Sequence, residues 1–534
     1  MGKGRTMTIE AFIADLKPAF DDAAIVHPDG LESYTRNTSE YRRDVPLAVR
    51  PTTAEQVQHL VRTARAHKVP LYAFSQGKNW GLGSKLPVKD GCVLVDLRDM
   101  NRIIEVNDTF GYAVVEPGVT QRQLADHLAA MGSRHFLDVT GSGADTSLVG
   151  NSLERGVAYN SIRAEMLLAV EVVLGTGELL KPGWGHLPDP GLTPLNRYGV
   201  GPQMDGLFSQ SNYGIVTRGT IQLVPRPEYQ STFMISLKDE SQLGPLFEAM
   251  RELHHAGVLD SIVHVGNKRR GELTLTPLIY NKLKDLGQEA TRERANAIVQ
   301  SQLKGPWSAL GILMGTKGVV GAMKKRVRQG LGRFGSIKFL TPGLLELAKT
   351  ATGKVPVPMV KEANIFLLGV EPLMKLTNGN PTNAALHSTY WSISESSPAP
   401  DQPDDGPGGI LFTAPMLPMT GEAVARSNEA IKQVGKEYGF DIAITYNMMH
   451  GRTIEGVVSL DFRRDDAQEV TRAQACLRAL HQVHIDLGYY PYRMDIQNMD
   501  LMVDENDLFW QVARDFKSVL DPDNIIAPGR YNLV

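Results

Sequence analysis

The stretch Ser75-Gln-Gly-Lys-Asn-Trp-Gly-Leu-Gly-Ser84 lies between two apolar runs, Val69–Phe74 and Cys92–Leu97, which predict short buried strands. Its closely spaced glycines let the backbone turn tightly and approach a ligand, because no Cβ intervenes. Successive amide N–H groups in such a turn form a concave anion site that suits a pyrophosphate. A glycine-rich hairpin without a ligand produces the same pattern, so this loop alone leaves both interpretations open.

The overall composition excludes several classes of protein. A chain of 534 residues with 42% hydrophobic and 22% charged residues predicts two or more globular domains. The net charge of −3 argues against nucleic acid or an anionic membrane as the main partner. The start of the chain, residues 1–6, has no apolar segment typical of a signal peptide, so we expect a cytoplasmic protein. Cys92 and Cys476 lie in apolar patterns and are predicted to be core thiols.

The first part of the chain alternates helical and strand patterns. We expect a short amphipathic helix over Ile9–Phe20, and a helix that Thr53 caps and that ends near His67. Strands are expected over 103–107 and 112–116, before a helix over Gln121–Met131 that Thr120 caps. This spacing is typical of a protein that mixes helices and sheets.

Two further loops rich in small residues follow. One is Thr140–Ser147, which leads into 149–156, and the other is Gly206–Gly214, which leads into the predicted strand Ile215–Leu223. Separate loops of Gly, Ser and Asn beside strands are hard to explain as turns alone. We therefore expect them to form the walls of one site for an extended polar ligand.

The pattern changes near Pro225. Beyond it, longer amphipathic helices such as Ser241–His255 and Gly421–Tyr438 alternate with strands. The stretch Thr316–Lys338 carries seven Lys and Arg residues and no acidic residue, which predicts a solvated helix face or a docking site for an acidic partner. Residues Ser394–Gly409 predict an exposed loop.

These loops, in this order, resemble the vanillyl-alcohol oxidase and p-cresol methylhydroxylase family of flavoproteins. The matching stretches are Gly77-Lys-Asn-Trp-Gly-Leu-Gly83, Val115-Glu-Pro-Gly-Val-Thr120, Val149-Gly-Asn-Ser-Leu-Glu-Arg-Gly-Val-Ala-Tyr159, Gly206-Leu-Phe-Ser-Gln-Ser-Asn-Tyr-Gly-Ile-Val-Thr217 and Leu520-Asp-Pro-Asp-Asn-Ile-Ile-Ala-Pro-Gly-Arg530. A single loop is a weak signal, whereas five in register are a strong one.

The resemblance implies an α+β fold with two domains. An FAD-binding domain comprises residues 1–228, to which residues 488–534 return, and a cap domain with an antiparallel sheet comprises residues 229–487. The glycine loop then donates backbone N–H groups to the FAD pyrophosphate. The cofactor-binding positions that the resemblance implies are Ser75, Gly77, Lys78, Asn79, Trp80, Gly81, Leu82, Gly83, Pro117, Gly118, Gly150, Asn151, Glu154, Gly156, Asn212, Gly214, Ile215, Val216, Tyr390 and Arg530.

The resemblance also implies a reaction. In this family a para-substituted phenol binds as its phenolate and loses hydride from the benzylic carbon to the flavin, which gives a p-quinone methide. A buried phenolate needs cationic and hydrogen-bonding partners. By resemblance, Tyr492 and Arg493 form the anion-binding pair, and Tyr159 is the tyrosine that follows the Arg-Gly-Val element.

The sequence departs from the family at other active-site positions. Leu82 replaces a phenolate-binding tyrosine, and the aspartate of the oxidases falls near Gly141 or Ser142. Asp145 lies close by in the sequence and is a candidate substitute. Glu455 stands where the oxidases have a histidine pair, and it is either a base with a raised pKa or a solvent-facing residue.

Covalent attachment of FAD stays open at this level. Ile410 occupies the position of the flavin-linking histidine of the oxidases, which argues against a histidyl link. Tyr390 is the candidate for a tyrosyl link of the methylhydroxylase kind, and His387 is the second candidate. Noncovalent FAD with Tyr390 in the core is the other interpretation.

The resemblance thus predicts an FAD-dependent oxidase, dehydrogenase or hydroxylase that acts on a small 4-alkylphenol or 4-hydroxybenzyl substrate. The altered pocket favours release or rearrangement of the quinone methide over its hydration. The electron acceptor is O₂ or a cytochrome or copper protein, and a homodimer or larger assembly is expected. The alternatives are a flavin enzyme for another alcohol or a hydroxy acid, whose carboxylate Arg493 would hold, and an electron-transferring flavoprotein subunit.

Overall fold

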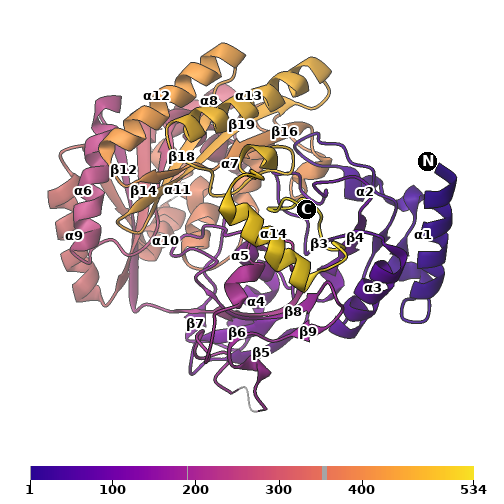
Figure 1. Ribbon diagram of the computed structural model, residues 1–534. Coiled ribbons are helices and arrows are strands. Elements are labelled where there is room, and N and C mark those ends of the chain that lie inside the picture. The colour runs from indigo at the N-terminus through magenta and orange to yellow at the C-terminus, as the bar shows by residue number, and fades with distance from the viewer. Residues whose placement is uncertain (1, 189–190, 352–357) are drawn as a thin grey trace.

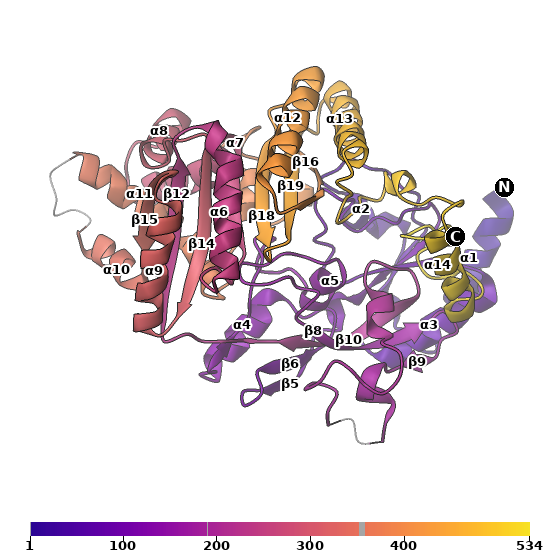
Figure 2. The same ribbon diagram turned by 60° about the vertical axis from the view of Figure 1, so that its left-hand side comes forward.

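The computed structural model describes residues 2–188, 191–351 and 358–534 (Figure 1). In these ranges, strands that precede residue 226 form three small sheets, and strands between residues 229 and 463 form one sheet of eight strands. The change occurs at Tyr229, where β12 begins, which is consistent with the predicted domain boundary. The larger sheet and its helices stand on one side of the molecule and the small sheets on the other (Figure 2).

A four-stranded sheet with the order β1-β2-β4-β3 contains the strand that precedes the glycine loop. Its strands are β1 (Ile25–Val26), β2 (Ala48–Val49), β3 (Leu71–Phe74) and β4 (Val93–Asp96), and β4 pairs in parallel with both β2 and β3. The helices of this part are α1 (Gly2–Leu16), α2 (Glu32–Thr35) and α3 (Ala54–His67). Thr53 caps α3 as predicted, because its side chain accepts a hydrogen bond from the Gln56 backbone N–H.

An antiparallel sheet with the order β5-β6-β10-β8-β9 carries the next two loops. Its strands are β5 (Ile103–Asn107), β6 (Tyr112–Val115), β8 (Leu167–Leu174), β9 (Leu179–Leu180) and β10 (Gly214–Gln222), and β7 (His135–Phe136) pairs with β11 (Val224–Pro225). The helices are α4 (Gln121–Ala130) and α5 (Leu148–Leu153). Thr120 and Gln123 form a complete capping box at the start of α4.

The eight-stranded sheet is antiparallel throughout its described pairings. Its strands are β12 (Tyr229–Leu237), β13 (Val263–Asn267), β14 (Trp307–Gly315), β15 (Gly335–Leu340), β16 (Gly408–Thr413), β17 (Met416–Pro418), β18 (Ala443–Met449) and β19 (Thr453–Arg463). Helices α6 (Leu243–His255), α9 (Lys317–Leu331), α12 (Gly421–Tyr438) and α13 (Ala467–Asp486) share one hydrophobic core with one face of this sheet.

The opposite face of the same sheet borders a second core. That core contains residues of α7 (Lys268–Asp285), α8 (Arg292–Gln302), α10 (Pro342–Ala351) and α11 (Pro358–Thr377). Side chains alternate between the two faces, as the pleat of a strand requires: on β13, Val263 and Val265 enter the first core, whereas His264 and Gly266 face a cavity.

The C-terminal segment returns to the small sheets. Helix α14 (Leu508–Leu520) is tied to the loop before β10 because Tyr213 donates to the Ala513 carbonyl, and the Leu71 N–H donates to the Ile525 carbonyl. Lys517 is buried and donates to the carbonyls of Asn212 and Ile526. Residues 508–534 therefore pack with the first part of the chain, whereas the Tyr490 carbonyl and the Tyr492 N–H bond to Met416 and Ala414 beside the eight-stranded sheet.

Some predicted elements differ from the structure. The helix expected over Ile9–Phe20 is α1 (Gly2–Leu16), so it begins earlier and ends before Pro18. The stretch Ser394–Gly409 is not uniformly exposed: Asp404 is buried, and β16 begins at Gly408. By contrast, α12 has the predicted bounds, and both cysteines are buried, as expected of core thiols.

Candidate active site

The predicted loops and one face of the eight-stranded sheet enclose a cavity of about 610 Å³. The loop side is formed by parts of the stretches 72–80, 141–159 and 208–216, together with Pro117 and Arg530. The opposite side is formed by side chains from β12, β13, β14, β16, β18 and β19 and from the start of α7. The stretches that sequence analysis singled out separately therefore border one space.

The glycine loop has the backbone conformation that requires glycine. Gly77, Gly81 and Gly83 have φ angles of +66°, +75° and +106°, which side-chain-bearing residues rarely adopt. Of the predicted cofactor residues in this loop, Ser75, Gly77, Lys78, Asn79 and Trp80 line the cavity. Burial lowers the pKa of Lys78, and its ammonium donates to the Gln402 side chain from the loop before β16.

The second loop region brings a buried ion pair to the cavity. Arg530 pairs with Glu154 and donates to the Tyr72 hydroxyl at 2.7 Å, so the end of the chain closes onto β3 and α5. Gly150, Asn151 and Glu154 line the cavity, as do Pro117 and the start of β10 at Gly214, Ile215 and Val216.

Other predicted cofactor residues do not line the cavity but pack behind the residues of its loop side. A Cβ on Gly118 would lie 2.4 to 2.7 Å from the carbonyl oxygens of Arg98, Leu97 and Met100. A Cβ on Gly156 would lie 2.2 Å from the Asn151 side chain.

The remaining predicted positions also lie behind the wall. Leu82 is fully buried, and Asn212 donates to the carbonyls of Ala527 and Val534, which fastens the C-terminal tail. These residues shape the site through packing and backbone position.

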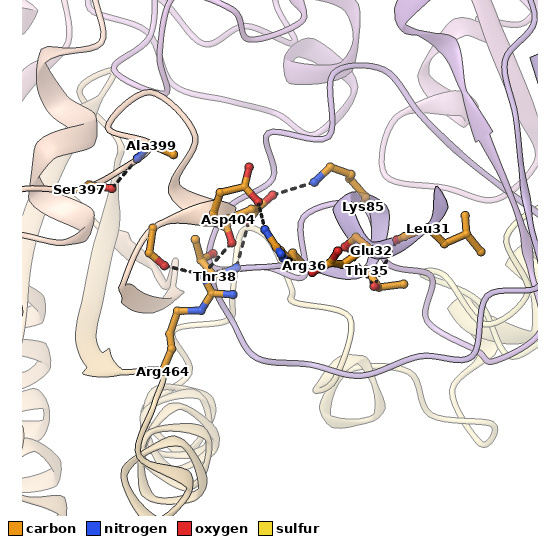
Figure 3. A network of polar contacts seen from close by, with 12 residues as sticks. Leu31, Glu32, Thr35, Arg36, Thr38, Lys85, Ser397, Ala399, Asp404 and Arg464 are labelled. Carbon is orange, nitrogen blue, oxygen red and sulfur yellow. Dashed lines mark hydrogen bonds and ion pairs between the residues drawn. The ribbon is translucent and has the colours of Figure 1, made fainter. Parts of the chain in front are cut away.

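A loop from the sheet side clamps the glycine loop from outside. Asp404 accepts hydrogen bonds from the Thr38 N–H at 3.0 Å and the Ser84 hydroxyl at 2.7 Å, and it pairs with Lys85 at 3.0 Å (Figure 3). Arg464 donates to the Asp404 carbonyl at 2.7 Å. The predicted exposed loop thus holds the two sides of the cavity together.

Of the predicted phenolate-binding residues, Tyr159 and Arg493 are among those that line the cavity, and Tyr492 precedes Arg493 in the chain. The Arg493 guanidinium donates to the Asn79 side chain at 2.7 Å. Tyr492 is partly buried, and Gln210 donates to its carbonyl at 3.1 Å. Burial raises the pKa of both tyrosines, that of Tyr159 to about 12, so each is a neutral hydrogen-bond donor near pH 7.

A polar chain on the sheet lies beside these residues. Asn447 on β18 donates to the Glu455 carboxylate on β19 at 2.8 Å, and its amide oxygen is 2.7 Å from His264 Nδ1 on β13. Burial raises the pKa of Glu455 to about 7, while the charge of Arg493 lowers it. The His264 ring packs on Tyr159 with centroids 5.0 Å apart.

This chain fixes the protonation of the histidine. Because the Asn447 amide group donates to the carboxylate, its oxygen faces His264 and Nδ1 must carry the proton. Burial lowers the pKa of His264 to about 4, so the ring is neutral near pH 7 and its Nε2 is an acceptor. This Nε2 is buried without a partner on a side chain that lines the cavity. His264 is therefore a candidate proton acceptor.

Asp145 lies apart from this cluster. Its carboxylate pairs with Arg122 at 2.9 Å, and both side chains are substantially exposed. Gly141 and Ser142, near which the resemblance implies an aspartate, both line the cavity, and the Ser142 hydroxyl donates to Thr146 at 2.9 Å. Neither of these two residues carries a carboxylate.

The candidates for covalent attachment lie beside the cavity. Ile410 lines it with an apolar side chain. Tyr390 is buried next to the cavity-lining Ser388 and Thr389, and its ring is 5.9 Å from that of His387. Asn281 donates to His387 Nδ1 at 3.2 Å.

Sequence analysis did not identify His264, Asn447 or Arg270, which also line the cavity. Each is a polar residue within or next to an apolar strand, and the alternation Thr445-Tyr-Asn447 is a signal of a mixed face. The pairing of β13 with β18 joins residues that are 183 positions apart, which this alternation cannot predict.

The residues present fit FAD. The left-handed Gly77 lines the cavity, the cationic side chains Lys78 and Arg530 border the loop side, and the buried Asn151 Oδ1 has no hydrogen-bond partner among the described residues. In the described ranges, no group of three or more side chains is arranged to hold a metal ion. No described helix is long and apolar enough to cross a membrane.

Comparison with known proteins gives the same class. The profile of a family described as FAD binding domain matches residues 45–183. The 1'-carboxy-chondrochloren decarboxylase of Chondromyces crocatus is 33% identical over 91% of this chain and 90% of its own length. The flavoprotein subunit of 4-cresol dehydrogenase (hydroxylating) of Pseudomonas putida is 28% identical over 96% and 93%.

Solved structures agree on the fold. A p-cresol methylhydroxylase with substrate bound superposes with a TM-score of 0.82 at 26% identity, over 99% of this chain and 97% of that one. The 4-ethylphenol oxidase of Gulosibacter chungangensis gives a TM-score of 0.84 at 24% identity over the same shares. The molecule is therefore a two-domain α+β flavoprotein. The chain belongs to the vanillyl-alcohol oxidase and p-cresol methylhydroxylase family and is an FAD-dependent enzyme.

Proposed function

We propose that this enzyme oxidises a para-substituted phenol, of the 4-alkylphenol or 4-hydroxybenzyl type, at its benzylic carbon. The observation that carries the proposal is the juxtaposition of Tyr159 and Arg493 with the His264–Asn447 pair inside one cavity that the glycine loop borders. FAD, when bound, supplies the acceptor for the hydride that leaves the benzylic carbon. The loop residues that line the cavity hold the cofactor, and the residues of the sheet side hold the substrate.

The chain's own residues bind the phenol as its anion. The Arg493 guanidinium and the hydroxyls of Tyr159 and Tyr492 are donors in a partly buried site, where charge-assisted hydrogen bonds are strong. A phenolate that loses hydride becomes a neutral quinone methide. These donors favour ionisation of the bound phenol, whose anion is a better hydride donor than the neutral phenol, and they hold it in the reactive geometry. Leu82 supplies no further donor, because it is buried as an apolar residue.

His264 is proposed to take a proton through its free Nε2. Glu455 acts through Asn447, whose orientation keeps Nδ1 protonated and Nε2 available. The proton comes from the phenol hydroxyl on binding. Glu455 is therefore a positioning residue in this proposal, and His264 is the group that meets the substrate.

The fate of the quinone methide follows from the site. Gly141 and Ser142, near which the resemblance implies the aspartate of the oxidases, carry no carboxylate, so we propose release or rearrangement as the main outcome. A substrate whose carboxylate is on the carbon that follows the benzylic carbon allows a further outcome, the loss of CO₂. The electrons of the broken C–C bond then form the vinyl double bond, and the quinone methide's exocyclic electrons restore the aromatic ring, which gives a vinylphenol. The relative from Chondromyces crocatus is named a decarboxylase, which supports testing this outcome.

The experiment is anaerobic mixing of the yellow holoenzyme with a panel of 4-alkylphenols and 4-hydroxybenzyl alcohols, followed by product analysis. We expect bleaching of the flavin, and a loss of about 10²-fold or more in its rate in Arg493→Ala. No bleaching with any phenol would overturn the proposed substrate class. A benzylic alcohol as the sole product of a 4-alkylphenol would overturn the proposed release or rearrangement.

A second candidate is oxidation of a hydroxy acid or another alcohol. Curated relatives that match part of the chain include a D-2-hydroxyglutarate dehydrogenase of Stutzerimonas stutzeri, which is 27% identical over 46% of this chain. In this alternative Arg493 holds the substrate carboxylate. Bleaching of the flavin by a 2-hydroxy acid, with binding of that acid lost in Arg493→Ala, would favour oxidation of a hydroxy acid over oxidation of a phenol.

The attachment of FAD and the electron acceptor are separate proposals. A tyrosyl link through Tyr390 predicts that flavin stays with acid-precipitated protein and is released from Tyr390→Phe, whereas noncovalent FAD is released from both. O₂ as acceptor predicts rapid reoxidation when air is admitted. An acidic protein acceptor would dock on the solvent-facing basic side of α9, and its reduction would slow as the salt concentration rises.

A further inference from the structure

We infer that the cavity holds a second anion-binding subsite at Arg270, which takes a carboxylate on the side chain of the phenolic substrate. This inference rests on the proposed function and adds the substrate's chemical class to it. The subsite lies on the sheet side of the cavity and differs from the Tyr492–Arg493 pair. It consists of Arg270 and Thr274 of α7 with Ser308, Thr445 and Ser459 of the sheet, all of which line the cavity.

Local structure aims Arg270 at the cavity. It lies in the first turn of α7, where its backbone N–H donates to the capping Asn267 side chain at 2.9 Å. A Cβ on the neighbouring Gly266 would lie 3.3 Å from Arg270 Cγ, so glycine leaves room for the arginine stem against the sheet. Thr274 follows four residues later and shares the same helix face.

The charge of Arg270 has no carboxylate in contact. Its guanidinium donates to the Ser459 hydroxyl at 2.6 Å and the Ala443 carbonyl at 3.4 Å, both neutral acceptors, while its buried Nε has no partner. Among the described residues none forms an ion pair with it. Burial lowers the pKa of Arg270, although the charge of Asp461 raises it. A buried guanidinium is costly unless it meets an anion.

The adjacent arginine shows the contrast. Arg269 lies 3.6 Å from Asp441 and 3.7 Å from Asp461, so the acidic side chains of this region are placed beside Arg269. Burial raises the pKa of Asp461 to about 6, so its carboxylate is largely ionised near neutrality. Both carboxylates lie within ion-pair distance of Arg269, whereas among the described residues none lies within that distance of Arg270, whose side chain faces the cavity.

The wider cavity is also short of negative charge. Its described lining contains Lys78, Arg270, Arg493 and Arg530 but one acidic side chain, Glu154, which already pairs with Arg530. Lys78 and Arg530 border the loop side, where the anionic part of FAD is expected, and Arg493 is proposed for the phenolate. Neither the anionic part of FAD nor the phenolate accounts for Arg270.

The spacing sets the shape of the ligand. Ser459, which contacts Arg270, lies four residues along β19 from Glu455, or roughly 13 Å. His264 and Asn447 occupy the same row of the sheet as Glu455 through the pairings of β13 with β18 and of β18 with β19. A phenol held beside His264 thus reaches Arg270 when a short flexible chain carries a carboxylate. We assign the substrate to the 4-hydroxyphenyl carboxylic acids with such a chain.

The test compares 4-(4-hydroxyphenyl)butanoate with 4-butylphenol, a neutral ligand of similar length. Where a ligand reduces the flavin of the anaerobic holoenzyme, its apparent dissociation constant is taken from the dependence of the reduction rate on its concentration; otherwise it is taken from the change in flavin absorbance. The proteins compared are the natural protein, Arg270→Met, Arg270→Lys and the exposed control Arg472→Met. Should Arg270→Met fail to fold, Arg270→Gln replaces it. The ratio of the two dissociation constants measures how much the carboxylate contributes to binding. A general effect of a substitution on the pocket changes both constants alike and leaves the ratio unchanged.

We expect the natural enzyme to prefer the butanoate, and Arg270→Met to lower this preference by roughly 10- to 100-fold, with Arg270→Lys between them and Arg472→Met unchanged. An unchanged preference in Arg270→Met would overturn the subsite. An altered flavin spectrum or lost FAD without any ligand would assign Arg270 to the cofactor and would also overturn it. Tight butanoate binding that depends on Arg270, without bleaching by any phenol, would support the subsite and refute the proposed oxidation.

Discussion

The two sides of the cavity are built on different principles. The loop side consists of glycines, backbone amides and short polar residues that follow one another in sequence, from Ser75 to Trp80 and from Gly150 to Glu154. The sheet side consists of single side chains, such as His264, Asn447 and Arg270, that strand pairing brings together from distant segments. The first side can hold a cofactor by shape, and the second can change the chemistry by substitution of single residues. This difference explains how a family can retain FAD while its substrates diverge.

The largest effect is expected from one methyl group on the loop side. Gly118→Ala places a Cβ against three backbone carbonyl oxygens that cannot move aside, so we expect destabilisation of about 1–3 kcal/mol and loss of FAD. The ratio of flavin to protein absorbance measures the cofactor. Gly321→Ala is the control, because a Cβ there meets nothing within 4 Å. Full FAD content in Gly118→Ala would show that the loop side tolerates substitution, which would contradict the proposed difference between the two sides of the cavity.

On the sheet side, Glu455→Gln should leave FAD bound and slow anaerobic reduction by a 4-alkylphenol roughly 10²-fold, because Asn447 loses its fixed orientation. The pKa of Glu455 is about 7, so the ionised form that orients Asn447 predominates above that pH. The reduction rate of the natural enzyme should therefore rise with pH through about 7, and this rise should vanish in the variant. A retained rise would assign the titration to another group.

The same carboxyl group links pH to stability. Its pKa in the folded protein lies above the ordinary value near 4.5, so the native state binds the proton more tightly than the unfolded chain does. The resulting stabilisation is present at low pH and is lost as pH rises through about 7. The pH dependence of the free energy of unfolding should weaken in Glu455→Gln over this range.

The clamp between the two sides should give a smaller effect. Asp404→Asn removes the ion pair with Lys85, whose side chain is 13% exposed, and should cost about 1–3 kcal/mol and speed the release of any noncovalent FAD. Asp405→Asn is the matched control, because Asp405 pairs with the exposed Arg36 and should change stability by less than about 0.5 kcal/mol. Equal effects of the two substitutions would contradict the role of the clamp.

The smallest effect is expected at Asp145. This residue forms a solvent-exposed ion pair with Arg122, so Asp145→Asn should cost at most about 1 kcal/mol and leave flavin reduction nearly unchanged. The rate of flavin reduction by a 4-alkylphenol is measured by stopped flow. A large loss of rate would restore Asp145 as the base that its position in the sequence predicts, and would move the chemistry to the loop side.

More of the loop side than of the sheet side could be predicted from the sequence. The cap at Thr120, the bounds of α12 and the left-handed glycines at Gly77 and Gly83 depend on local chemistry, which a short window of sequence contains. The contact between His264 and Asn447 depends on the order of strands β13, β18 and β19, which no local pattern specifies. The same limit applies to Asp404, which looks like a loop residue until the glycine loop packs on it.

The central claim is that the loop side holds the cofactor and the sheet side performs the proton chemistry. Its most direct test is anaerobic reduction of His264→Leu holoenzyme by a 4-alkylphenol, with the FAD content measured in the same sample. The substitution removes the Nε2 acceptor and leaves the glycine loop intact. We predict full FAD content with a rate about 10²–10⁴-fold below that of the natural enzyme. Reduction at the natural rate, or loss of FAD from this variant, would contradict the claim.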